Sequence, residues 1–134
     1  SMEDHQLRNA ITSNFDTYRG CAIAIADIES EDLRIIASQA ADEMLNISGI
    51  QSSYVLYRTG DIVNISARSM GAMNVQLIME MLGGGGHQTM AAAQLSNISV
   101  SDAKVRLLQV IDQFYAQINA QEEAPQERPE EMQN

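Results

Sequence analysis

The sequence predicts an α/β (α+β) fold in which helices flank a mixed β-sheet of about four to five strands. Short apolar runs suited to buried strands alternate along the chain with segments whose apolar side chains recur at helical spacing. The chain has 134 residues, of which 45% are hydrophobic, and this is enough for one compact domain with its own core. We therefore expect a single domain of mixed architecture.

The first half of the chain supplies a helix, a strand and a second helix. Residues 3–14 are predicted to form a short helix, and residues 21–26 form a continuous run of small and apolar side chains that suits a strand buried on both faces. The following helix is expected to be capped by Ser30, to run from Leu33 to Leu45 with an apolar side of helical spacing, and to end before Gly49.

A β-hairpin is expected next. Residues 53–57 and 62–67 are rich in residues that favour strands, and Gly60 supplies the turn between them. Asn74 is expected to cap a helix that continues to Leu82, where the glycines that follow break it.

The chain is predicted to finish with a strand and a long helix. Residues 90–95 are assigned to the strand and residues 102–120 to the helix, which either Ser99 or Ser101 starts. The residues of this helix expected to face inward are Val105, Leu108, Ile111, Tyr115 and Ile118.

The ends of the chain are expected to lie outside the domain. Residues 1–17 are interpreted as a linker or a cloning scar, because a serine precedes Met2 and the sequence looks like a piece of a longer protein. Residues 18–120 are assigned to the domain. Residues 121–134 are dominated by Glu, Gln and Pro, and we expect a disordered acidic tail.

Charge and cysteine content restrict the partners and the compartment. The net charge of −10 argues against a long nucleic acid, whose phosphates need clustered Lys and Arg, but it permits one small anion held locally. Cys21 is the single cysteine, so no internal disulfide forms, and a cytoplasmic location is expected. No apolar run approaches the roughly 18 residues of a membrane span, so no membrane contact is expected of this chain.

Catalytic side chains are few. The two histidines, His5 and His87, are not flanked by other metal ligands at a suitable spacing, so neither a metal site nor a bound cofactor is expected. No nucleophile elbow, phosphate-binding Walker loop or dinucleotide-binding glycine motif is present. We predict no catalytic residue in this chain.

The most informative motif is the tract Gly83-Gly84-Gly85-Gly86-His87. Glycine loses the most conformational freedom on folding, so four in succession indicate positive φ angles or the close approach of another group. Successive amides of such a tract can converge on an anion, and the His87 ring could add a further hydrogen bond, so a phosphate is the expected ligand. The alternative is that Gly83 caps a helix and the other glycines form a flexible connection.

Four further residues are candidates for the same site. Strand alternation places Ser66 and Arg68 on one face of the sheet, and a guanidinium suits phosphate, although Arg68 alone could be an ordinary surface residue. Asn74 is interpreted as a cap rather than a ligand. The hydroxyl of Thr89 could donate to a ligand or satisfy its own loop.

Ser66-Ala67-Arg68-Ser69, then Asn74-Val75, then the Gly-rich tract with His87, and then Ala91-Ala92, together resemble the DHHA1 domain of the DHH phosphoesterases. The resemblance covers roughly residues 18–118 and supports a DHHA1-like mixed fold. It implies that Arg68 and Ser69 contact a substrate phosphate, that Gly84 to Gly86 line it, and that His87 hydrogen-bonds near the scissile or leaving phosphate.

Within that family, the segments Gln88-Thr89-Met90 and Gln94-Leu95 look most like those of the GdpP-type phosphodiesterases. That similarity implies a nucleotide-binding domain in a signalling enzyme that hydrolyses cyclic di-AMP to pApA and is anchored in the bacterial membrane by N-terminal helices. Manganese and the attacking water would belong to a preceding DHH domain, so this chain is expected to be inactive alone. Three residues separate His87 from the alanine pair, where many members have two, so this chain departs from the family pattern at this point.

Two other functions remain as alternatives. The first is the substrate-binding part of an oligoribonuclease or single-strand exonuclease of the same superfamily, which would hold a short oligonucleotide. The second is a non-catalytic sensor, interaction or homodimerisation module, in which the glycine loop meets a protein.

Overall fold

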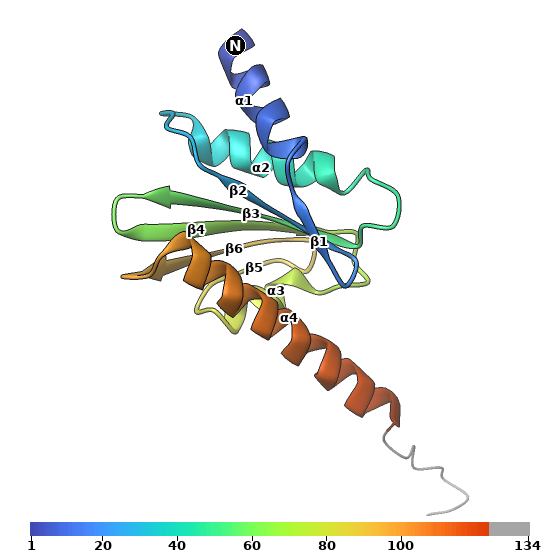
Figure 1. Ribbon diagram of the computed structural model, residues 1–134. Helices are drawn as coiled ribbons and strands as arrows, with labels where there is room; N and C mark the ends of the chain where they lie inside the picture. Colours follow the sequence, from blue (N-terminus) through green and yellow to red (C-terminus); the bar gives the residue numbers. More distant parts are fainter. Residues whose placement is uncertain (124–134) are drawn as a thin grey trace, which may run out of the picture.

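The computed structural model describes residues 1–123 and shows a mixed sheet with helices on both faces (Figure 1). The sheet has six strands in the order β1-β2-β3-β4-β6-β5, and β2 and β3 pair in parallel while the other neighbours are antiparallel. The predicted fold class is confirmed, with two short edge strands, β1 and β5, that the sequence did not indicate. The strands are β1 (Asp16–Tyr18), β2 (Cys21–Ala26), β3 (Ser52–Thr59), β4 (Ile62–Ser69), β5 (Gly85–Gly86) and β6 (Met90–Ser96).

Two helices cover each face of the sheet. One face packs against α1 (Met2–Thr12) and α2 (Leu33–Met44), and the other against α3 (Val75–Glu80) and α4 (Val100–Glu123), as Figure 1 shows. Among the described residues, no helix is both long enough and apolar enough to pass through a membrane.

The larger core lies on the α3 and α4 face. Alternate residues of β3 and β4, including Tyr54, Leu56 and Ile65, point into it, and α3 closes one end. Here the predicted inner face of α4 is partly wrong. Val105 is 52% exposed, whereas the buried residues of α4 are Ala103, Leu107, Val110, Ile111 and Phe114.

The reason lies in the sequence of α4, which has two adjacent apolar stripes that share Ile111. Helical spacing alone does not choose between them, and the sheet selects the stripe that contains the small residue Ala103. Leu108, Tyr115 and Ile118 of the predicted stripe lie at the edge of the core, partly buried.

The smaller core, on the opposite face, explains where the surface stays open. Helix α2 presents the small residues Ala37, Ala40 and Ala41, and it packs closely on β2 and β3. This core includes no residue of β4, β5 or β6. On this face β4 carries Asn64 and Ser66, which are polar, so nothing draws a helix over that half of the sheet.

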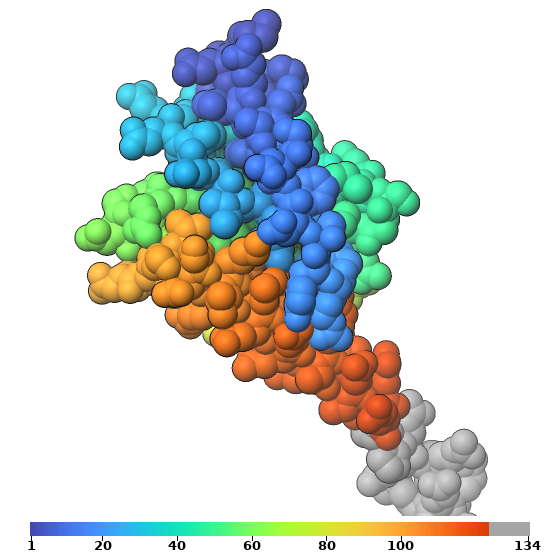
Figure 2. All heavy atoms as spheres, in the orientation of Figure 1, coloured from blue at the N-terminus to red at the C-terminus, as the bar shows by residue number. Residues whose placement is uncertain are grey.

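The N-terminal residues that we expected to be a linker take part in the fold. They form α1 and β1, and Ile11 of α1 is buried against the smaller core. Figure 2 shows the dark blue residues of α1 at one end of the molecule, with the C-terminal end of α4 toward the other.

Several helix boundaries differ from expectation, and α3 ends at Glu80 instead of Leu82. The N-cap of α2 is Asp32 instead of Ser30. The hydroxyl of Ser30 accepts a hydrogen bond from the amide of Asp32, two residues further along the chain. Helix α4 continues to Glu123, beyond the predicted end at residue 120, and Ser99 caps it by accepting from the Asp102 amide. From residue 124 onward, the predicted acidic tail lies outside the described residues.

Cys21 provides a simple test of the larger core. Its side chain is fully buried beside Ser52, whose hydroxyl lies 3.2 Å from the Cys21 sulfur, and burial raises the pKa of the thiol. We therefore expect Cys21 to resist a chromogenic disulfide reagent in the folded protein and to react fully in denaturant, because the thiolate is the reactive form. Rapid labelling of the native protein, measured by absorbance, would contradict this packing.

Candidate functional site

A groove with a volume of about 580 Å³ lies on the face of the sheet that α2 covers only in part. Its floor is formed by β4 and β6, its near wall by the N-terminal half of α2, and its far edge by β5. We call this feature the α2 groove. The residues with polar side chains that line it are Ser30, Glu31, Arg34, Ser38, Tyr57, Thr59, Asn64, Ser66, Arg68 and Gln94.

Arg68 is held firmly at one end of the α2 groove. Its side chain is only 10% exposed, its Nε donates to the carboxylate of Asp42 at 3.1 Å, and Nη1 donates to the carbonyl of Ala67 at 2.9 Å. Its Nη2 makes no hydrogen bond with the residues that the structure describes. Arg68 is therefore oriented by the protein and retains donors for a ligand.

Strand alternation brings Ser66 to the same face as Arg68, as predicted. It also adds Asn64, which the sequence reasoning missed although the same two-residue period indicates it. The Asn64 amide donates to the hydroxyl of Thr59 at 2.8 Å, and this contact fixes its orientation. Asn64, Ser66 and Arg68 thus form a polar row along the groove floor.

Ser69 lies on the other face of the sheet from Arg68. Its hydroxyl donates to the carbonyl of Gln88 at 3.1 Å and accepts from the amide of Gly71 at 3.3 Å. The Ser69 side chain therefore ties the chain after β4 to the turn before β6, and it does not line the α2 groove.

Asn74 and Thr89 also serve the surrounding loops. The side chain of Asn74 caps α3 by accepting from the Leu77 amide at 3.3 Å, in agreement with the cap interpretation. Thr89 is exposed, and its carbonyl accepts from the Ser69 amide at 3.0 Å. Neither residue lines the α2 groove.

The glycine tract has two structural tasks. Gly83 ends α3 with a φ of +81°, and its amide donates to Glu80, while the Gly84 amide donates to Met79 at 2.8 Å. The amide of His87 likewise donates to Met90 at 2.7 Å. The expectation that these successive amides converge on an anion is therefore wrong for Gly83, Gly84 and His87, because the fold already uses them.

The second task is the close approach of β5 to β6. A Cβ on Gly84 would lie 2.1 Å from the carbonyl oxygen of Ala92, and one on Gly86 would lie 2.6 Å from the backbone of Ala91. Gly85 is different, because a Cβ there meets nothing within 4 Å. Gly85 and Gly86 line the α2 groove, and of these two only Gly86 is required by packing.

The amide of Gly86 is the one member of the tract whose direction suits a ligand. Hydrogen-bonded and non-bonded pairs alternate along an antiparallel ladder, and His87 and Met90 form a bonded pair. The amide of Gly86, in the next pair, is therefore directed away from β6 at the free edge of the sheet.

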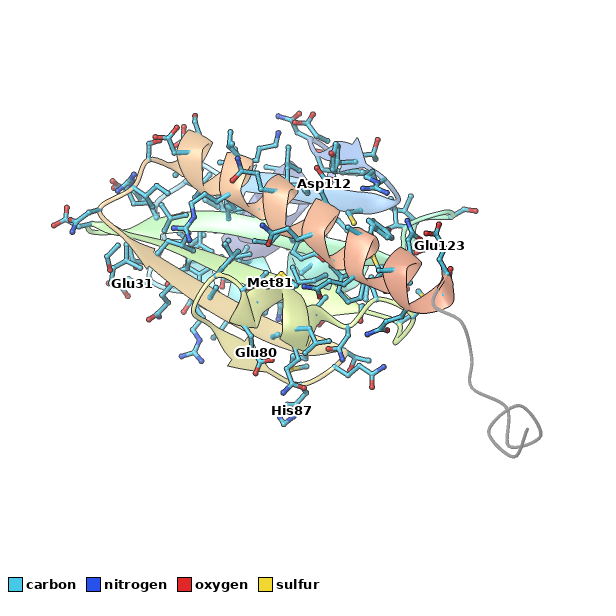
Figure 3. All side chains as sticks on the ribbon, turned by 90° about the horizontal axis from the view of Figure 1, so that it is seen from below. Glu31, Glu80, Met81, His87, Asp112 and Glu123 are labelled. Carbon is cyan, nitrogen blue, oxygen red and sulfur yellow. The ribbon has the colours of Figure 1, made fainter. Side chains whose placement is uncertain are left out.

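His87 lies at the tip of the turn between β5 and β6 and is exposed. Figure 3 shows its ring pointing away from the body of the protein, and the residue does not line the α2 groove. Within residues 1–123, no group of three or more His, Cys, Asp or Glu side chains is arranged to hold a metal ion.

The domain is thus of the α+β class, with a mixed sheet of this order and an arginine held at the floor of an open groove beside a glycine-rich edge strand. The model of the DHHA1 domain family matches residues 20–117. The chain belongs to the DHHA1 domain family.

Curated relatives extend the comparison. The chain is 42% identical over 110 residues to the cyclic-di-AMP phosphodiesterase PdeA of Listeria monocytogenes, covering 81% of this chain and 17% of that protein. It is 48% identical over 98 residues to the cyclic-di-AMP phosphodiesterase GdpP of Bacillus subtilis, covering 69% of this chain and 15% of that protein. The matched region is thus less than a fifth of the length of these relatives.

Solved structures show the same fold. An exopolyphosphatase-related protein from Bacteroides fragilis superposes with a TM-score of 0.74 at 19% sequence identity, covering 89% of this chain and 37% of that one. This likeness supports the arrangement of the sheet and helices.

Proposed function

We propose that this chain is the substrate-binding domain of a DHH/DHHA1 phosphodiesterase that hydrolyses cyclic di-AMP to pApA. The observation that supports this most is the α2 groove, in which Arg68 is held beside the open edge formed by Gly85 and Gly86. The similarity to proteins named cyclic-di-AMP phosphodiesterases supports the choice of nucleotide.

In this proposal Arg68 binds a substrate phosphate. Its contacts with Asp42 and Ala67 set the plane of the guanidinium before the ligand arrives, so little side-chain entropy is lost on binding. The groove floor beside it carries Ala92 and Ser66, whose small side chains leave room for a sugar and phosphate. The free amide of Gly86 adds a neutral donor at the same edge.

The remaining candidate residues act less directly in this proposal. Ser69, Asn74 and Thr89 hold the loops that flank the Arg68 end of the groove. Gly83 and Gly84 position β5. His87, on an exposed turn, hydrogen-bonds to a phosphate that is presented from a neighbouring DHH domain.

Hydrolysis itself is assigned to that DHH domain. The described residues offer no cluster of metal ligands, so the manganese ions and the attacking water are placed outside this chain. This chain then contributes binding and orientation, and it has no turnover alone.

A nucleotide titration tests the proposal. We expect cyclic di-AMP to shift the amide NMR signals of β4, β5 and β6 around the α2 groove, whereas manganese and cyclic di-AMP together give no pApA with this chain. NMR is chosen because it detects weak binding, which is expected when a ligand that lies between two domains can contact only one of them.

Three outcomes would contradict the proposal. Production of pApA by this chain alone would show that the chain itself carries the catalytic residues. Tighter binding of longer oligoribonucleotides than of cyclic di-AMP would favour the oligoribonuclease alternative. No shift with any nucleotide would favour a protein-binding module.

A further inference from the structure

The α2 groove has a second cationic side chain, Arg34, which the sequence reasoning did not identify. Arg34 lies in the first turn of α2 and lines the groove, but no ion pair or hydrogen bond joins it to any residue that the structure describes. Most other cations of the described chain have an acceptor, as Arg8, Arg19, Arg58, Arg68 and Lys104 show. Arg106, on α4 and away from the groove, is the other exception among the described residues.

Arg34 lies at the end of the groove opposite to Arg68. Asp42, which pairs with Arg68, is in the last turn of α2, so the helix rise separates it from Arg34 by about 12 Å. The positions along β4, which forms part of the groove floor, show a similar separation between the two ends of the groove. Tyr57 pairs with Asn64, which lies about 13 Å from Arg68 along β4.

Charge effects agree with this placement. Burial raises the pKa of the Tyr57 hydroxyl, and the positive charge of Arg34, which lines the same groove, opposes that rise. Glu31 borders the same end of the groove, and Figure 3 shows it well separated from His87. No ion pair links Glu31 to Arg34 in the described part of the chain.

We propose that Arg34 binds the second phosphate group of a dinucleotide whose first phosphate is held by Arg68. This inference rests on the proposed function. Two cations at opposite ends of one groove suit a ligand that carries two anionic groups. At the Arg34 end the floor presents Gln94, the register partner of Asn64, and the Gln94 amide can pair with the donor and acceptor edge of a base. The groove therefore selects dinucleotides over mononucleotides.

The test compares two charge-removing variants of the full 134-residue chain. Arg34→Gln and the matched control Arg106→Gln each remove one exposed arginine that has no partner among residues 1–123, so they change the net charge equally. Cyclic di-AMP, pApA and AMP are titrated into each protein and the wild type, and affinities are read from amide NMR shifts. We expect Arg34→Gln to weaken both dinucleotides about five- to tenfold, with AMP unchanged, and Arg106→Gln to match the wild type for all three.

The outcomes separate this inference from the proposed function. If the wild type binds dinucleotides and Arg34→Gln binds them as well as Arg106→Gln does, the role of Arg34 is overturned while the proposed function stands. An equal loss for AMP and dinucleotides also overturns it, because Arg34 would then belong to a single phosphate site. If the wild type binds none of the three ligands, both proposals fail.

Discussion

Replacing Gly84 by alanine is expected to destabilise the protein by at least about 3 kcal/mol, the upper range for overpacking a well-packed site. The added Cβ would lie 2.1 Å from the Ala92 carbonyl oxygen and 2.7 Å from the Ala93 Cα. Both obstacles are backbone atoms in β6, a strand held between β4 and β5, so neither can move without breaking the ladder. In thermal denaturation followed by circular dichroism, a loss of this size lowers Tm by roughly 10 °C or more.

Gly85→Ala is the matched control for that experiment. It adds the same methyl group to the next residue of the tract, where a Cβ meets nothing within 4 Å. We expect its Tm to stay within a few degrees of the wild type, since the loss of backbone freedom in the unfolded chain even favours alanine slightly. Equal melting of the two variants would show that β5 does not approach β6 as described.

The second large effect is expected at Arg68. In a phosphodiesterase that carries this domain together with its DHH domain, Arg68→Ala should lower kcat/KM for cyclic di-AMP about ten- to hundredfold. This corresponds to the roughly 1.5 to 3 kcal/mol of a hydrogen bond to a charged group. The measurement is steady-state hydrolysis with the manganese concentration held constant.

Arg68→Lys distinguishes charge from geometry. Lysine keeps the positive charge but lacks the fork that bonds Asp42 and Ala67 while offering a further donor to the ligand, so an intermediate loss is expected. Asp42 is 61% exposed and stays hydrated when its partner is removed, so the variants should remain folded, which a melting curve checks. An unchanged kcat/KM in both variants would show that Arg68 does not bind a substrate phosphate.

Much of the fold could be predicted from local patterns. The apolar run at 21–26, the hairpin around Gly60 and the Asn74 cap are short-range signals, and each appears in the structure where it was expected. The edge strand β5 was missed because two glycines carry no side-chain pattern, and its pairing with β6 depends on residues beyond the turn.

The candidate site was predicted only in part. Alternation from Arg68 correctly placed Ser66 on the same face, but Ser69 and His87 do not line the groove. The glycine amides were expected to be free, and local sequence could not show that Gly83 and Gly84 donate to carbonyls of α3. Arg34 was missed because its segment is far from the motif and joins the site only through packing of α2 on the sheet.

The sequence by itself determined the α+β class, the family and the arginine that lies in the groove, because periodicity and motif spacing are local properties of the chain. The tertiary structure decided which amides remain available, which stripe of α4 is buried and which distant side chains border the groove. Those features depend on how α2, α4 and β5 pack against the sheet, and such contacts join residues that no local pattern connects.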